Sequence, residues 1–173
     1  RGDMGAEVVK VESLAEGDET RRWPPFRIDR DGEPTGTVYL SANRNKRSLA
    51  LDLRSDDGRA VVHRLAQWAD VVIESFGPGA AARLGVDANT LRALNTRLVC
   101  CNISGYGSVG PMREGKGYDV ILQAFCGMLA ITGEPDAPPV RSPFSPVDQA
   151  TGLDALIGIQ GGLLDGEATR HGG

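Results

Sequence analysis

Asp70-Val71-Val72-Ile73-Glu74, followed at once by Ser75-Phe76-Gly77-Pro78-Gly79, is the stretch of this chain that decides its fold. A short apolar run rich in β-branched residues and bounded by turn residues is typical of a strand buried in a parallel sheet. The glycines and the proline that follow end the strand and lead into a short helix that closes at Leu84-Gly85. The stretch therefore predicts a strand–turn–helix unit.

The same alternation of strands and helices continues on both sides of this stretch. Strands are predicted at Ala6–Val11 and Leu98–Ile103, and helices at Ser55–Ala69 (capped by Ser55), Asp87–Leu94, Gly117–Leu129 and Val147–Leu164. Strand–helix–strand units of this length imply parallel strands joined by crossover helices. We therefore expect an α/β fold, a Rossmann-like parallel sheet flanked by helices.

The segment between the first strand and the first helix is harder to interpret. Ser13–Gly36 is polar and contains Trp23-Pro24-Pro25 and several glycines, so we expect a loop there. Val38–Ala42 is interpreted as an extension toward the following basic stretch, and Leu49–Leu53 alternates apolar and polar residues like an edge strand.

Composition limits the function. The 173 residues are 40% apolar and 24% charged, enough for one globular domain with a real core. The net charge of −4 gives no general attraction to nucleic acid or to an anionic membrane, and the apolar runs are shorter than the ~20 residues of a membrane span. The three cysteines, an odd number, are interpreted as buried reduced thiols, and no Cys/His spacing suggests a metal site.

A binding site is predicted where the strands end. Ligands of open parallel sheets bind beyond the carboxyl ends of the strands. Ser75-Phe76-Gly77 and Ser104-Gly105-Tyr106 occupy two such ends, and both carry a glycine that allows a ligand close to the backbone. Any doubly wound fold has glycine turns in these places, so the pattern gives a location without a chemistry.

Asp148 supplies a candidate chemistry. It follows Ser145-Pro146-Val147 and precedes a long apolar run, so a proline-stiffened turn brings its carboxylate to the start of a helix. Unpaired N–H groups at a helix start favour an anion there. The plain alternative is that Asp148 is only the N-cap of that helix.

Several short motifs accompany Asp148 in a fixed order. They are Asn43-Arg44-Asn45-Lys46-Arg47-Ser48, Glu74-Ser75-Phe76-Gly77-Pro78-Gly79, Ile103-Ser104-Gly105-Tyr106-Gly107 and Gly117-Tyr118-Asp119. This ordered set resembles the class III CoA-transferases, the family of formyl-CoA and carnitine-CoA transferases. The resemblance runs from Gly5 to about Gly172, and it implies that Asp148 is the nucleophile that takes the acyl group.

The resemblance also implies a set of CoA contacts. These are Leu51, Arg54, Ser75, Phe76, Gly77, Arg83, Ser104, Gly105, Tyr106, Lys116, Gly117 and Tyr118. Each has a plainer alternative: Arg54 as a solvated charge, Phe76 as a core residue, Arg83 as a partner of helix-end carbonyls and Lys116 as part of a basic loop.

Two positions depart from the family pattern. Ser13 stands where formyl-CoA transferases often carry a basic residue, which puts that phosphate contact in doubt. Tyr118 stands where the related acyl-CoA racemases carry a histidine for proton transfer. A tyrosine is a poor base at neutral pH, and this favours transfer over racemisation.

For the whole protein the resemblance implies more. Residues 1–173 would be the CoA-binding large domain, incomplete at both ends, with a second, smaller domain absent, and the isolated piece would be inactive. The full protein would be an interlocked homodimer that uses acyl-CoA and carboxylic acid substrates and no metal. Reduced cysteines and a CoA-dependent role predict a cytoplasmic location. The alternatives are an acyl-CoA racemase and a CoA- or nucleotide-binding module without chemistry, which would bind CoA without a covalent adduct.

Overall fold

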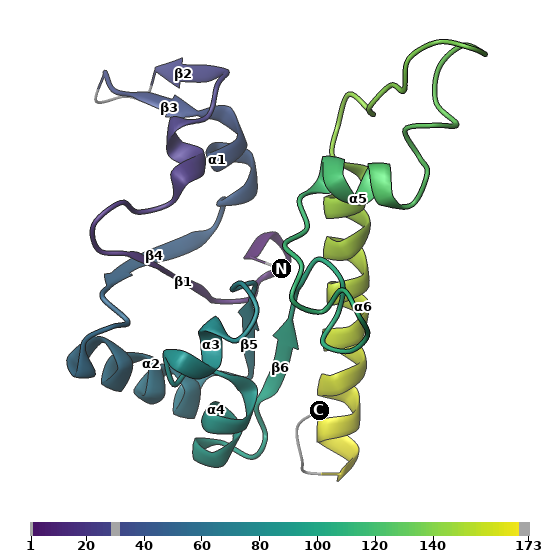
Figure 1. Cartoon of the computed structure of the whole chain (residues 1–173). Helices are drawn as coiled ribbons and strands as arrows, with labels where there is room; N and C mark the ends of the chain where they lie inside the picture. Colours follow the sequence, from purple (N-terminus) through teal and green to yellow (C-terminus); the bar gives the residue numbers. More distant parts are fainter. Residues whose placement is uncertain (1, 29–31, 170–173) are drawn as a thin grey trace. The chain divides into compact units, whose positions relative to one another are not determined.

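The computed structural model describes residues 2–28 and 32–169 (Figure 1). The chain divides into two compact units, Arg1–Arg59 and Ala60–Gly173. The single domain expected over residues 1–173 therefore stays a prediction.

The first unit is built on a parallel pair of strands. β1 (Val8–Ser13) pairs with β4 (Lys46–Leu51), with Val8 opposite Lys46 and Ser13 opposite Leu51. A 3₁₀ turn, η1 (Gly2–Met4), precedes β1. Between the two strands lie η2 (Glu19–Arg22), the antiparallel hairpin of β2 (Phe26–Ile28) and β3 (Pro34–Gly36), and α1 (Thr37–Ala42).

Three expectations for this unit were wrong in part. The expected loop Ser13–Gly36 contains a 3₁₀ turn and a hairpin, whose three-residue strands are too short and too exposed to give an alternating pattern. Val38–Ala42 is helical instead of extended. Gly36, just before it, is packed so closely that a Cβ would lie 2.2 Å from the Thr20 carbonyl oxygen, a constraint between distant segments. The last strand begins at Lys46, three residues before the predicted start.

The second unit contains the strand that the sequence predicts best. β5 (Val71–Glu74) pairs in parallel with β6 (Val99–Asn102), and α3 (Ala80–Arg83) and α4 (Ala88–Leu94) connect them. α2 (Asp56–Trp68) precedes β5. Their core consists of Ala66, Leu91 and Leu98, with Val62, Ala69, Val72 and Cys100 packed against it.

The predicted cap of α2 is confirmed, and the residue predicted to start α4 proves to be its cap. The Gly58 N–H donates to Ser55 Oγ over 3.0 Å at the start of α2. The Asp87 carboxylate accepts from the N–H groups of Asn89 and Thr90 at the start of α4. Each cap satisfies orphan donors of its first turn, which explains why both helices begin where a capping residue stands in the sequence.

Two further helices complete this unit. α5 (Asp119–Phe125) is shorter than the predicted Gly117–Leu129 because the chain turns at Gly127, where φ is +80°. α6 (Pro146–Thr169) packs against β6, and Figure 1 shows the two side by side. Gly162 makes this contact close: a Cβ there would lie 3.0 Å from Val99 Cγ1.

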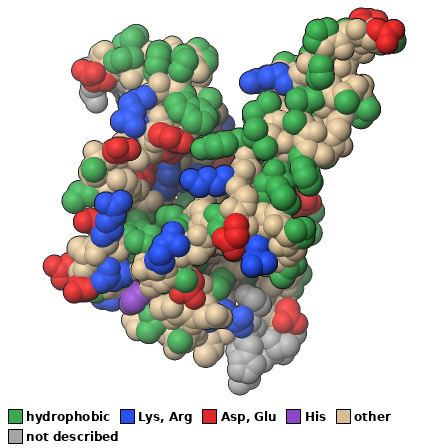
Figure 2. All heavy atoms as spheres, viewed as in Figure 1, with side chains coloured by type: hydrophobic (Ala, Val, Ile, Leu, Met, Phe, Trp, Pro, Cys, Tyr) green, Lys and Arg blue, Asp and Glu red, His purple; other side chains and the backbone are tan. Residues whose placement is uncertain are grey.

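Apolar side chains remain at the surface of the second unit. Figure 2 shows them gathered over α5 and the segment that follows it. They include Ile121, Phe125, Ile131, Val140 and Phe144, and on α6 Leu153, Ile157 and Leu164. Exposed apolar surface of this extent is typical of an interaction surface.

The cysteines are free thiols, as expected, but they are not all buried. Cys100 is half-buried, and its burial raises the pKa of its thiol, whereas Cys126 is exposed at the end of α5. Within the described part of the chain, no helix has both the length and the apolar character needed to cross a bilayer.

Candidate active site

Glu74 fixes the carboxyl ends of β5 and β6 to each other. It lies opposite Asn102 in the parallel pair, and the Asn102 side-chain amide donates to its carboxylate. The other carboxylate oxygen accepts from the Phe76 N–H over 2.8 Å, and the Glu74 carbonyl accepts from the Ile103 N–H over 2.9 Å. One side chain therefore sets the start of both predicted ligand turns. In the sequence Glu74 belongs to the motif that ends a strand, and nothing in that pattern predicts this role.

The turn after β5 is open. Ser75 and Gly77 are exposed, and a Cβ on Gly77 would meet nothing within 4 Å. Phe76 is 38% exposed, so the alternative that it is an ordinary core residue is wrong. Its ring is available to a ligand, as the resemblance implies.

Arg83 lies in the last turn of α3, a few residues beyond that turn. Its guanidinium is exposed, and Nη1 is 3.5 Å from the Pro78 carbonyl oxygen. This separation is at the long limit for a hydrogen bond, so the contact holds the arginine weakly. The structure is therefore compatible with both predicted roles of Arg83, as a partner of the carbonyl groups of its own turn and as a cation that binds a phosphate.

The turn after β6 is in contact with the segment before α5. Gly105 and Gly117 touch through their backbones, since a Cβ on Gly105 would lie 2.6 Å from the Gly117 Cα. Tyr106 stacks edge-on against Phe125, with the ring centroids 5.2 Å apart. The structure thus brings two predicted contact segments together, with Ser104 and Lys116 exposed beside them.

Tyr118 and Asp119 open α5 and connect this contact to Asp148. Tyr118 is 69% exposed and precedes the first helical residue. The Asp119 carboxylate turns to the start of α6, where Oδ2 accepts from the N–H groups of Val147 over 2.9 Å and of Asp148 over 3.2 Å. Backbone contact at Gly117 and these two hydrogen bonds make one continuous site.

Asp148 lies in the first turn of α6, but it is not the cap of that helix. Asp119 takes the N–H groups that an N-cap would use, so the plain alternative for Asp148 is wrong. In the described part of its unit, no residue donates a hydrogen bond to the Asp148 carboxylate. Partial burial, and then the negative charge of Asp119, raise the pKa of Asp148. Asp148 as a whole residue nevertheless remains exposed at the surface.

The two remaining predicted contacts lie in the first unit. Leu51 is the half-buried last residue of β4, and Arg54 is exposed three residues later. Two hydrogen bonds hold the Arg54 backbone. Its N–H donates to Asp52 Oδ1 over 2.9 Å, and its carbonyl oxygen accepts from Arg59 Nη1 over 2.8 Å. Its guanidinium stands at the surface, which suits both a solvated charge and a phosphate contact.

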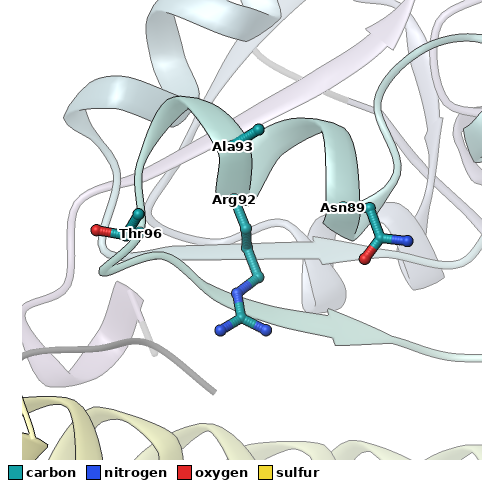
Figure 3. Close-up of a pocket in the computed structure, with 4 residues that line it drawn as sticks. All are labelled: Asn89, Arg92, Ala93 and Thr96. Carbon is teal, nitrogen blue, oxygen red and sulfur yellow. The ribbon is translucent and has the colours of Figure 1, made fainter.

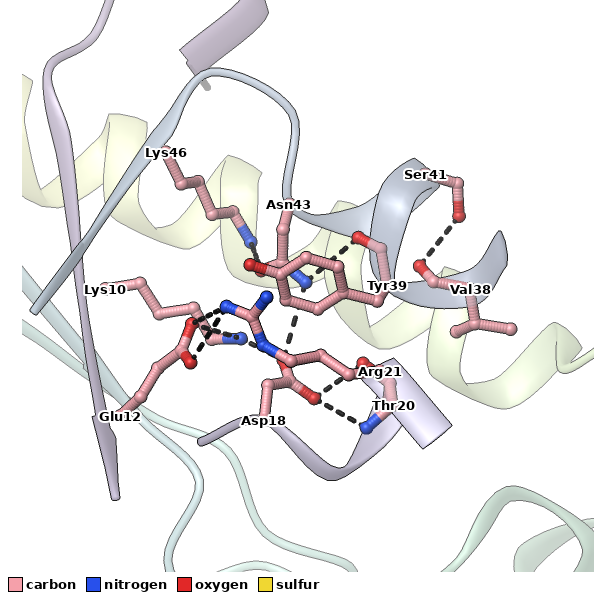
Figure 4. Close-up of polar contacts among 10 residues, drawn as sticks. All are labelled: Lys10, Glu12, Asp18, Thr20, Arg21, Val38, Tyr39, Ser41, Asn43 and Lys46. Atoms are coloured by element: carbon pink, nitrogen blue, oxygen red, sulfur yellow. Dashed lines mark hydrogen bonds and ion pairs between the residues drawn. The ribbon is translucent and has the colours of Figure 1, made fainter. Parts of the chain in front are cut away.

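A polar cluster supports β1 in the first unit (Figure 4). Glu12 is only 7% exposed and is held by Arg21 over 3.3 Å and by Lys10 over 3.5 Å. The Arg21 guanidinium lies 3.9 Å from the centre of the Tyr39 ring, and Lys10 also pairs with Asp18. Sequence reasoning missed this cluster because its members are spread from β1 to α1.

A surface pocket of about 380 Å³ lies elsewhere in the second unit (Figure 3). It is lined by Asn89, Arg92, Ala93 and Thr96, on α4 and the turn that follows it. That turn precedes β6, so the pocket lies at the amino end of the strand, whereas Ser104 follows its carboxyl end. It takes no part in the candidate site.

The sequence model of CoA-transferase family III matches residues 2–173. The chain belongs to this family. Its parallel strand pairs flanked by helices agree with the fold that the family resemblance predicted, and the roles of the site residues stay predictions.

Similar proteins agree with this assignment. The chain is 44% identical over 164 residues to the succinate–glutarate CoA-transferase of Agrobacterium fabrum, covering 94% of this chain and 41% of the relative. It is 39% identical to the succinyl-CoA:glutarate CoA-transferase of Mus musculus, covering 99% of this chain and 38% of the relative. The chain thus spans about two fifths of the length of these relatives.

Solved structures show the same fold. The crystal structure of a CAIB/BAIF family protein from Brucella suis matches with a TM-score of 0.93 at 43% identity, covering 99% of this chain and 45% of that one. The prediction of an α/β fold is therefore confirmed.

Proposed function

We propose that this chain forms the CoA-binding part of a class III CoA-transferase, which moves CoA from an acyl-CoA donor to a carboxylic acid with Asp148 as nucleophile. One observation carries the assignment of Asp148. Its carboxylate stands in the first turn of α6 without a hydrogen-bond donor among the described residues of its unit, since Asp119 caps the helix in its place. An uncommitted carboxylate beside glycine turns suits attack on a thioester.

In this proposal the reaction passes through an anhydride, a thioester and a second anhydride, all formed on Asp148. The Asp148 carboxylate attacks the thioester carbonyl, a mixed anhydride forms and CoA leaves as thiolate. The thiolate attacks the Asp148 carbonyl carbon, which gives an aspartyl-CoA thioester and releases the donor acid. The acceptor carboxylate then attacks the same carbon and expels CoA as thiolate, which gives a second anhydride. The thiolate attacks the acceptor carbonyl of this anhydride. Asp148 is regenerated as a carboxylate, and the acceptor leaves as its CoA thioester.

The surrounding residues have separate tasks in this proposal. The open turn at Gly77 admits the pantetheine arm close to the backbone, and the touching backbones of Gly105 and Gly117 hold the other two contact segments together. Arg83 and Lys116 are exposed cations suited to the phosphates of CoA. Phe76 offers a ring face for the adenine.

The names of the similar proteins suggest the substrate class. Two relatives are named for succinate or succinyl-CoA and glutarate. We therefore assign short dicarboxylic acids as acceptors and their CoA thioesters as donors. A carboxylate at the far end of such an acyl chain requires a cationic partner in the protein. Transfer rates with a panel of mono- and dicarboxylic acceptors test this, since dicarboxylic acids should be the better acceptors.

Trapping the intermediate tests the function. The full-length protein is mixed with succinyl-CoA, quenched with hydroxylamine and digested. The mass of the peptide that carries Asp148 is then measured by mass spectrometry. A hydroxamate on Asp148 that requires the thioester is expected. Asp148→Asn should abolish both adduct and transfer, whereas Asp154→Asn, an exposed aspartate on the same helix, should leave both intact.

The alternatives give different results. An acyl-CoA racemase would exchange the α-proton of a branched acyl-CoA with deuterated water and leave Asp148 unmodified. A binding module would retain CoA and yield neither adduct nor exchange. Either outcome rejects the transfer mechanism.

The assembly and location belong to the same proposal. We assign the exposed apolar surface over α5 and α6 to the interface of a homodimer, as the family resemblance implies. Light scattering of the full-length protein, with Phe125→Ser as the variant, checks this assignment. A cytoplasmic location follows from the use of CoA and from free thiols, and cell fractionation tests it.

A further inference from the structure

Asp119 is part of a hydrogen-bonded chain that ends at the backbone of Asp148. The Ser142 N–H donates to Gln123 Oε1 over 3.0 Å, and the Gln123 side-chain amide donates to Asp119 Oδ1. Asp119 Oδ2 in turn accepts from the N–H groups of Val147 and Asp148. The chain joins the first turn of α5, the segment before α6 and the start of α6.

Burial makes this chain rigid. Gln123 is 1% exposed, so its amide has no water to replace a lost partner. Its position is set by α5 on one side and by the Ser142 backbone on the other. The orientation of the Asp119 carboxylate is thereby fixed, and with it the first turn of α6.

The chain has a single polarity. Every bond points toward Asp119, which accepts at both oxygens, and a carboxylate is the side chain that can do so without presenting a donor. An asparagine at 119 would place its amide group against either Gln123 or the helix N–H groups. Rotating the Gln123 amide would move that conflict to the Ser142 N–H.

From this geometry we propose that Asp119 is a positioning residue for Asp148. By occupying the N–H groups at the start of α6, it keeps the Asp148 carboxylate out of the cap position and directed to the substrate. Its negative charge, held next to the nucleophile, opposes ionisation of Asp148 and keeps the carboxylate basic. The inference rests on the proposed role of Asp148 as nucleophile.

The charge balance at Asp148 is simple. Among the described residues of its unit, Asp119 is the charged group that acts on it, and it raises the pKa of Asp148 in addition to the effect of burial. A more basic carboxylate is a better nucleophile once ionised. Removing the charge of Asp119 should therefore move the acid limb of the pH profile to lower pH.

A reversal of the chain separates hydrogen bonding from charge. In Asp119→Asn the donors conflict, and we expect kcat to fall about ten- to a hundredfold, as for a misplaced reacting group, with little change in KM. In the double variant Asp119→Asn with Gln123→Glu, the carboxylate at 123 accepts from Ser142 and from the new amide. That variant restores every hydrogen bond and shifts the negative charge away from Asp148. We expect it to recover most of kcat while its acid limb stays below that of the unsubstituted protein.

A matched control removes the charge of a helix-capping carboxylate elsewhere. Asp87→Asn takes the negative charge from the cap of α4, away from the site, and should leave the pH profile unmoved, since asparagine caps a helix about as well as aspartate. Melting temperatures of all variants identify any that fail to fold. Because Asp87 and Asp119 both cap helices with a carboxylate, only a role in the reaction distinguishes their pH profiles.

A readout that needs no turnover separates this inference from the proposed function. In full-length protein labelled with ¹³Cγ-aspartate, the Asp148 signal is assigned through Asp148→Asn and titrated. A lower Asp148 midpoint in Asp119→Asn, together with an aspartyl adduct in the unsubstituted protein, supports the inference. The same shift without any adduct rejects the proposed function and the positioning of a nucleophile with it, and leaves only the electrostatic coupling of the two carboxylates. An adduct in the unsubstituted protein together with unchanged kcat and midpoint in Asp119→Asn overturns the positioning role alone.

Discussion

Gly105 and Gly117 lie back to back, so that a Cβ on Gly105 would fall 2.5 Å from the backbone nitrogen of Gly117. No side chain separates the turn after β6 from the segment that leads into α5. The contact holds the two predicted pantetheine segments at the distance of touching backbones. It therefore links the sheet to the helix pair that carries Asp119 and Asp148.

Gly105→Ala should separate these segments. The methyl group must displace backbone, and overpacking of this kind costs about 1–3 kcal/mol. We expect a lower free energy of unfolding and weaker CoA binding, measured by urea denaturation and calorimetry. Gly107→Ala is a poor control because φ there is +79°, whereas Gly152→Ala on α6 meets nothing within 4 Å and should be tolerated. Unchanged CoA affinity in a folded Gly105→Ala protein would contradict the assignment of this turn.

Gly77→Ala tests the other turn without disturbing the fold. A Cβ there meets nothing within 4 Å of the protein, so stability should change by less than about 0.5 kcal/mol. If CoA approaches the backbone at Gly77, the methyl group occupies its space and the Kd should rise about tenfold or more. Equal CoA affinity for the variant and the unsubstituted protein would place the ligand elsewhere.

Local signals account for the parts of the fold that the sequence predicted. The strand Val71–Glu74 and the caps Ser55 and Asp87 depend on neighbours within a few residues, and each was found where expected. The strand pair within Ser13–Gly36 was missed because each of its strands has only three residues, too few to give an alternating pattern.

The site shows the same division. Glycine turns at strand ends could be predicted from pattern, but the cap of α6 could not, because Asp119 precedes its partner Val147 by 28 residues. The sequence therefore suggested Asp148 as the cap of α6, because Asp148 itself stands at the start of that helix. Only the packing of α5 against α6 reveals that another carboxylate holds that position.

Asp148→Asn should separate activity from stability. The folded-state pKa of Asp148 is raised, so the folded protein binds a proton more tightly than the unfolded chain there. Its contribution to stability is thus present at low pH and lost as the pH rises through the raised pKa. Above that pH the substitution should stabilise the protein, by up to about 0.5 kcal/mol at this exposed position, while abolishing transfer. Melting curves at pH 3 and pH 7 check the sign, and a variant that is less stable at pH 7 would contradict it.

Asp18→Asn should weaken the protein toward acid through the opposite sign. Partial burial opposes ionisation of Asp18, but the Lys10 ammonium and the hydroxyl and N–H of Thr20 outweigh it and lower the pKa to about 2. Such a carboxylate stabilises the fold above its unfolded pKa, and this stabilisation is lost as the pH falls from about 4 to about 2. We expect the substitution to cost about 1–2 kcal/mol at pH 7 and progressively less between pH 4 and pH 2.

Glu16→Gln is the matched control for this prediction, since Glu16 forms an exposed pair with Arg22 at 3.9 Å. Surface pairs of this kind contribute about 0–1 kcal/mol, so its urea midpoint should stay near that of the unsubstituted protein at every pH. If the ion pair of Asp18 with Lys10 stabilises the fold, the difference in urea midpoint between Asp18→Asn and Glu16→Gln should become smaller as the pH falls. A constant difference would contradict the prediction, because it would mean that neither Lys10 nor Thr20 favours the ionised form of Asp18 in the folded protein.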